Sequence, residues 1–184
     1  MKQPRYWWIL GVLVVLGVMV RVATRGGTAA NLSAQSVRQT PTPSALGVGS
    51  TAPLFRLTTI DGQHYSTASL RGKIVILFAM FASCADCIPE GQTLSQVQQT
   101  YSSRGVTVLG VDIVREESVQ ALRQYQRVGH ITIPLAAYSA EVVQQYQLVQ
   151  PDMTYVIVRD GTIKYKNMQS LSYADFQRKL DALR

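Results

Sequence analysis

One stretch, IVILFAMFASCADCIPE at residues 74–90, decides how this 184-residue chain folds. It opens with an unbroken apolar run rich in β-branched residues, which is typical of a strand covered on both faces. Two cysteines, Cys84 and Cys87, then follow with two residues between them. Beyond the cysteines, apolar residues recur three and four positions apart as far as Tyr101, which is helical spacing. The stretch therefore predicts a strand, a cysteine pair and a helix in direct succession.

The strand-to-helix junction gives the cysteine pair its expected chemistry. A thiolate is the nucleophilic form of cysteine, and the unpaired N–H groups and dipole of a helix start stabilise a nearby anion. We therefore expect Cys84 to be the exposed, attacking sulfur. Cys87, one turn inside the helix, is expected to be more buried, to close a disulfide with Cys84 and to release the mixed disulfide. The negative charge of Asp86 should disfavour the Cys84 thiolate, which favours a reducing pair.

Charge and composition limit the classes of function. Residues 1–49 carry five basic side chains and no acidic one, whereas residues 50–184 carry 13 basic and 11 acidic ones, a net charge of +2. The globular part therefore lacks the basic surface that phosphate backbones require, and no nucleic acid partner is expected. Two cysteines are too few for a disulfide scaffold, and their close spacing indicates a redox pair or half of a metal site. No cofactor is expected.

The N-terminal part differs in composition from the rest. Residues 1–23 have a basic start and then a nearly continuous apolar run, which predicts an N-terminal membrane anchor or signal segment. Residues 24–47 are rich in small and polar residues and are expected to form a flexible linker. Residues 48–184 are expected to form the folded domain. We therefore expect a single-pass protein of the cell membrane with an extracytoplasmic domain, or a secreted or periplasmic protein after signal cleavage.

The order of expected elements in the domain is a hairpin, then alternating strands and helices, then a second hairpin and a closing helix. Turns at Asp61-Gly62 and Asp160-Gly161 close the two hairpins. Strands at 74–78 and 106–111 alternate with helices, which indicates parallel pairing. A helix over 116–125 is expected to carry acidic residues in its first turn. The fold class is therefore α/β, with a mixed central β-sheet, helices on both faces and an N-terminal β-hairpin.

Four groups of residues carry a resemblance to a known family. They are Gly49-Ser50-x-Ala52-Pro53-x-Phe55 with Asp61-Gly62, Leu70-Arg71-Gly72-Lys73, Cys84-x-x-Cys87-x-x-Glu90, and Tyr155-Val156-Ile157 with Asp160-Gly161. With them, residues 48–184 resemble the membrane-anchored thioredoxin-like proteins of the TlpA/ResA type, in the redoxin and AhpC-TSA-like superfamily.

The resemblance implies a thioredoxin-like fold and an extracytoplasmic thiol–disulfide oxidoreductase acting on protein thiols and disulfides. It further implies a reductant, for example in cytochrome c maturation, that is anchored by its N-terminal helix and supplied with electrons by a membrane thiol reductant. Glu90 is implied as the catalytic acid that adjusts the thiol pKa of the cysteine pair. A solvated first-turn acid is the alternative for Glu90.

Three positions depart from the family pattern. Ser83 stands where a tryptophan usually precedes the first cysteine, and Phe78 stands where a buried Asp or Asn is frequent. The loop facing the cysteines usually carries a cis-proline followed by threonine. Alignment without a gap places Asp152 at that position, with Pro151 one residue earlier. Because cis peptide bonds are nearly confined to proline, both residues stay candidates for substrate binding.

Other functions stay open beside the oxidoreductase. A Sco-like copper-binding or delivery protein has one more residue between its cysteines and a distal histidine, for which His64 and His130 are isolated candidates. A peroxiredoxin-like antioxidant needs a threonine three residues before its reactive cysteine, and Phe81 occupies that place. A tethered thioredoxin-like binding module with a structural disulfide is the non-enzymatic alternative. No metal ligand is predicted.

Overall fold

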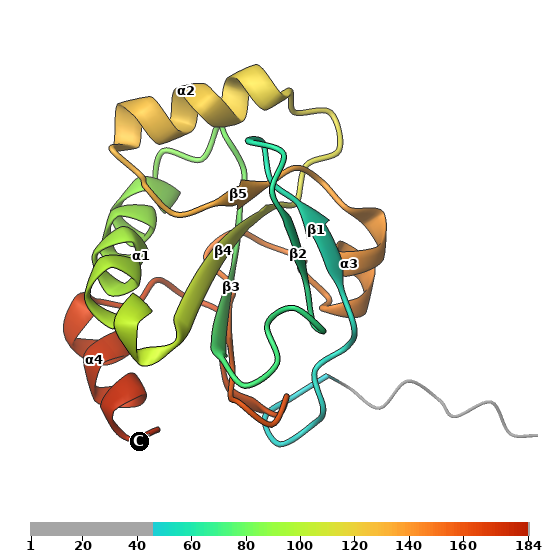
Figure 1. Cartoon of the computed structure of the whole chain (residues 1–184). Helices are drawn as coiled ribbons and strands as arrows, with labels where there is room; N and C mark the ends of the chain where they lie inside the picture. Colours follow the sequence, from blue (N-terminus) through green and yellow to red (C-terminus); the bar gives the residue numbers. More distant parts are fainter. Residues whose placement is uncertain (1–45, 184) are drawn as a thin grey trace, which may run out of the picture. The chain divides into compact units, whose positions relative to one another are not determined.

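The computed structural model of the chain describes residues 46–183 (Figure 1). The expected anchor, residues 1–23, lies outside the described residues, and so does nearly all of the expected linker, residues 24–47. Within residues 46–183, no helix combines the length and the apolar character that crossing a membrane requires. This finding corrects the expected single-pass membrane location, while the domain boundaries stay predictions.

Within the described residues, the central sheet consists of five strands, β3 (Ile74–Met80), β4 (Val106–Asp112), β5 (Leu135–Ala136), β6 (Thr154–Ile157) and β7 (Ile163–Asn167). Their order is β5-β4-β3-β6-β7. β3, β4 and β5 run parallel, whereas β6 is antiparallel to β3 and β7 is antiparallel to β6. The central strand is buried along its whole length, as its continuous apolar sequence predicts. The expected mixed sheet is confirmed.

Helices cover both faces of this sheet. They are α1 (Cys87–Tyr101), α2 (Val119–Gly129), α3 (Ala140–Gln145) and α4 (Tyr173–Asp181), with a short 3₁₀ turn at Ser102–Arg104. Side chains of α1, α2 and α4 share a core with Ile76 and Phe78 of β3, and α1 lies beside α4 (Figure 1). Leu77 and Ala79, on the opposite face, pack with α3. The expected N-terminal hairpin, β1 (Arg56–Thr58) and β2 (His64–Ser66), forms a sheet of its own on that second face.

Helix α2 begins later than the sequence predicts. Ser118 is its N-cap, with an extended backbone and a side chain that accepts a hydrogen bond from the Ala121 N–H at 3.1 Å. Glu116 and Glu117 therefore precede the helix, and its first turn contains no acidic residue. The expectation of a helix over 116–125 with acids in its first turn was wrong, because the serine cap decides where the helix starts.

The strand register brings three loops to one edge of the sheet. Met80 at the end of β3 pairs with Asp112 at the end of the parallel strand β4. The antiparallel strand β6 begins at Thr154, opposite Phe78. The cysteine segment after β3, the loop after β4 and the loop before β6 therefore meet at this edge, and the candidate site lies there.

Candidate redox site

Cys84 and Cys87 form a disulfide at the junction between β3 and α1, with an S–S distance of 2.00 Å. The Cys87 N–H donates to Cys84 Sγ at 3.1 Å, so a helix-start donor lies against this sulfur, as expected for stabilising a thiolate. Cys84 is 8% exposed and Cys87 is fully buried. Cys84 is therefore the more accessible sulfur, although it is more buried than the sequence suggests. Cys87 is the first residue of α1 and does not lie one turn inside it.

Asp86 lies between the two cysteines and is the N-cap residue of α1. Its side chain is exposed and makes no capping hydrogen bond to the helix. The carboxylate therefore adds a negative charge beside the sulfurs but does not cap the free N–H groups at the start of α1. This placement fits the predicted redox-tuning role, which stays a prediction.

Glu90 lies one turn further along α1 and is buried, with 1% of its surface exposed. Its Oε1 accepts a hydrogen bond from Thr154 Oγ1 at 3.0 Å, whereas its Oε2 accepts none from any described residue. Burial raises the pKa of Glu90 to about 7. Hydrogen bonds from Thr154, Ser170 and the Leu171 main chain oppose this rise, and the Asp152 carboxylate adds to it. A solvated first-turn acid is thus excluded, and Glu90 is a buried carboxyl that can change its protonation state near neutral pH.

The loop before β6 places Asp152 beside Glu90. All peptide bonds within residues 46–183 are trans, so Pro151 lacks the cis bond that is usual in this loop of the family. Asp152 has a left-handed backbone with φ of 61°, and its N–H donates to the Ala79 carbonyl at 2.9 Å. Its half-buried carboxylate interacts with Glu90 and Ser170, and its Oδ1 accepts no hydrogen bond from a described residue. Burial raises the pKa of Asp152, and the charge of Asp86 adds to that rise.

Glu117 is a site residue that sequence reasoning missed. Its carboxylate accepts hydrogen bonds from the N–H and the hydroxyl of Ser83, each at 3.1 Å, and from the Ala82 N–H. Ser83, which stands at the family's tryptophan position, is thereby tied to the loop before α2. The acidic pair ahead of the Ser118 cap was the available signal, but the sequence does not show where its carboxylates point.

Asp112, at the end of β4, is a second residue that sequence reasoning missed. It is fully buried; its Oδ1 accepts a hydrogen bond from the Val114 N–H at 2.9 Å, and its Oδ2 has no partner among the described residues. Burial raises the pKa of Asp112 to about 6, the Val114 hydrogen bond opposes this rise, and the charge of Glu117 adds to it. The site edge therefore carries a set of carboxyl groups: Asp86, Glu90, Asp112, Glu117 and Asp152.

The two histidines considered as metal ligands, His64 and His130, lie in the N-terminal hairpin and at the end of α2. His64 Nδ1 lies 3.0 Å from Thr58 Oγ1 in the hairpin, and His130 ends α2 in a left-handed conformation. Across the described part of the chain, no three His, Cys, Asp or Glu side chains form a cluster that could hold a metal ion. The residues gathered around the cysteine pair are carboxyl groups and hydroxyl groups, which suit proton transfer beside a dithiol.

The sheet order, the covering helices and a disulfide between β3 and α1 define a thioredoxin-like thiol–disulfide oxidoreductase. The chain belongs to the AhpC/TSA family, whose family model matches residues 48–166. Both conclusions confirm the class inferred from the sequence motifs.

Individual relatives agree with this assignment. The thiol-disulfide oxidoreductase ResA of Geobacillus kaustophilus is 28% identical over 142 residues, covering 77% of this chain and 80% of the relative. The thioredoxin-like protein YneN of Bacillus subtilis is 24% identical over 95% of this chain and 96% of its own length. The crystal structure of a thiol:disulfide interchange protein of the thioredoxin family from Chlorobium tepidum is 27% identical, with a TM-score of 0.65 over 73% of this chain and 96% of that one.

Proposed function

We propose that this oxidoreductase acts as a reductant of protein disulfides. The observation that carries the proposal is the set of carboxyl groups around the cysteine pair: Asp86, Glu90, Asp112, Glu117 and Asp152. None of the ion pairs formed within residues 46–183 involves these acids. Negative charge nearby makes a thiolate less stable, and stabilisation of the reduced thiolate form is what makes a dithiol oxidising. This carboxyl set therefore favours a low reduction potential.

The reaction begins with the reduced protein. The Cys84 thiolate attacks one sulfur of a substrate disulfide, forms a mixed disulfide and releases the other substrate sulfur as a thiolate, which takes up a proton. Cys87 then loses its proton and attacks Cys84 Sγ, which frees the second substrate thiol and leaves the Cys84–Cys87 disulfide. Two electrons pass to the substrate, and a separate dithiol reductant must restore the protein by the same exchange in reverse.

Glu90 is proposed as the catalytic proton acceptor for Cys87. It lies one turn along α1 from Cys87, and burial places its pKa at about 7, where it can accept a proton at neutral pH. Thr154 Oγ1 donates a hydrogen bond to its Oε1, and Ser170 and the Leu171 main chain also act on this carboxyl group. Tyr125 of α2 donates to the Cys87 carbonyl at 3.0 Å and holds the start of α1 in place.

Pro151 and Asp152 are proposed as the substrate-facing side of the site. The Asp152 N–H is bonded to the Ala79 carbonyl, so it cannot pair with a substrate backbone. Recognition at this position then depends on the Asp152 carboxyl and on the Pro151 ring. The resemblance to the TlpA/ResA type makes an apocytochrome c cysteine pair the proposed substrate.

The direction of electron flow is tested by the reduction potential of the Cys84–Cys87 pair, measured by equilibration in thiol redox buffers. We expect a value at or below about −270 mV, the potential of thioredoxin. A value near the −120 mV of strong oxidants would refute the reducing direction. Insulin reduction by Cys84→Ser and Cys87→Ser variants tests the exchange itself, and wild-type rates in both variants would refute it.

A further inference from the structure

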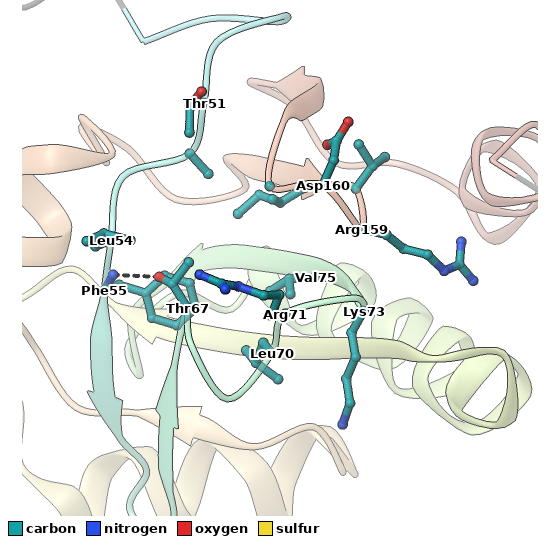
Figure 2. A pocket seen from close by; sticks show the side chains of 14 residues that line it. Thr51, Leu54, Phe55, Thr67, Leu70, Arg71, Lys73, Val75, Arg159 and Asp160 are labelled. Atoms are coloured by element: carbon teal, nitrogen blue, oxygen red, sulfur yellow. Dashed lines mark hydrogen bonds between the residues drawn. The ribbon is translucent and has the colours of Figure 1, made fainter.

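A pocket of about 380 Å³ opens at the end of the sheet opposite the cysteine pair (Figure 2). Its lining comes from residues 51–55 ahead of β1, the loop 67–73, the start of β3, the end of β6 and the turn between β6 and β7. The cysteine pair follows the other end of β3, seven strand residues away. At about 3.3 Å per residue this separation is on the order of 20 Å. The pocket is therefore distinct from the redox site.

The walls of the pocket are largely apolar. Phe55, Leu70, Val75 and Ile157 are buried there and belong to the core of the hairpin side of the sheet. Leu54, in contrast, is 75% exposed. A small molecule with an apolar body would contact these walls and would cover Leu54 from water.

The rim of the pocket carries cations that lack a carboxylate partner. The side chains of Arg71 and Lys73 form no ion pair or hydrogen bond with any residue from 46 to 183. Arg159 donates to the main-chain carbonyls of Arg104 at 3.0 Å and Leu183 at 3.4 Å, and it forms no ion pair with a carboxylate among residues 46–183. Figure 2 shows Arg71 lying across the pocket toward Thr67, whereas Lys73 and Arg159 extend outward at its edge.

The acid that lines the pocket, Asp160, offsets only one of its three cations. Asp160 Oδ1 accepts a hydrogen bond from the Thr162 N–H at 2.8 Å within its own turn. This hydrogen bond stabilises the β6–β7 turn. With three basic residues and one acidic residue, the lining keeps a net positive charge. The guanidinium of Arg71 is the group best placed to hold an anion over the apolar walls.

We propose that this pocket binds a small amphipathic organic anion, with its apolar body on the Phe55, Leu70 and Val75 walls and its headgroup on Arg71. An inorganic anion would leave the apolar walls unused, and a neutral apolar molecule would cover Arg71 without pairing its charge. The volume lies within the range of small-molecule sites. An acyl chain and an aromatic ring are two sources of the same chemistry, a hydrophobic body with one carboxylate.

The test uses the full chain and NMR titration of its backbone amides with four probes. Decanoate and 2-naphthoate each have an apolar body and a negative charge. Decanol has the apolar body without the charge, and inorganic phosphate has the charge without an apolar body. We expect saturable shifts confined to residues 51–55, 67–75 and 157–161 with at least one carboxylate, and binding at least tenfold weaker for decanol and phosphate. Decanoate alone would identify an acyl ligand, and 2-naphthoate alone an aromatic one. No such shifts, or phosphate binding as tightly as the carboxylates, would overturn the proposal.

A matched pair of charge-removing variants distinguishes anion binding in the pocket from attraction to the overall positive charge of the protein. Arg71→Gln should weaken carboxylate binding at least tenfold. Lys164→Gln removes an exposed cation of β7 that does not line the pocket, and it should leave binding unchanged. Insulin reduction should stay at the wild-type rate in both variants, because the redox site lies at the other end of the sheet. Unchanged binding in Arg71→Gln, or an equal loss in both variants, would refute the site.

Discussion

Replacing Glu90 with glutamine should change how the stability of the oxidised protein depends on pH. Glutamine has nearly the same shape, and its carbonyl can still accept the hydrogen bond from Thr154. Its amide cannot ionise, so the variant does not place a charge in the buried site. The comparison therefore isolates the free energy of ionising one buried carboxyl group.

The sign follows from the raised pKa. The folded state keeps the Glu90 proton up to about pH 7, whereas an unfolded glutamate loses it near pH 4.5. The stability associated with this proton is fully present below about pH 4.5 and is lost as the pH rises through about 7. The rise in pKa corresponds to about 3 kcal/mol of unfolding free energy across that window. Glu90→Gln should lack this loss, so it should gain stability relative to the wild type as the pH rises.

Urea unfolding at a series of pH values from 4 to 8 measures the effect. The readout should be far-UV circular dichroism, because Trp7 and Trp8 are the tryptophans of the chain and precede the folded domain. Burial also raises the pKa of Asp112 and Asp152, so each stability curve contains their contributions. The difference between variants reports Glu90 together with its coupling to Asp152. Glu116→Gln, an exposed acid ahead of α2, is the control and should give a nearly flat difference. A flat difference for Glu90→Gln as well would refute the assignment of Glu90 as a buried, neutral-pH proton carrier.

Two further substitutions test the surroundings of the site, and a third tests the packing of the core. Asp152→Asn removes a charge that raises the pKa of Glu90, so the Glu90 carboxyl should titrate at lower pH by NMR, and an unchanged titration would exclude their coupling. Glu117→Ala removes the acceptor for Ala82 and Ser83 and should cost about 1–3 kcal/mol in urea unfolding, against a change within about 0.5 kcal/mol for Glu116→Ala. Gly110→Ala would place a Cβ 2.4 Å from Leu135 Cδ2 in the core beside β5. This substitution should destabilise the fold by about 1–3 kcal/mol. A melting curve identical to that of the wild type would show that Leu135 can move aside.

The local signals in the sequence were sufficient for most of the fold. The continuous apolar run predicted a covered strand over 74–78, which the structure extends to Met80, and the Asp-Gly pairs closed both hairpins. Ser172 and Asp175 form the capping box that begins α4. These features depend on neighbours within a few residues, so the sequence contains the physical information that fixes them.

The composition of the site depended on contacts that no local pattern encodes. Asp152 meets Glu90 because the antiparallel pairing of β6 with β3 brings the loop before β6 to the cysteine edge. Glu117 reaches Ser83, 34 residues away, because parallel pairing of β3 with β4 ends both strands together. The cysteine pair and its place at a helix start were therefore determined by the sequence alone. The burial and mutual approach of the carboxyl groups around it were decided by the tertiary structure, because strand register is set by packing of the whole sheet.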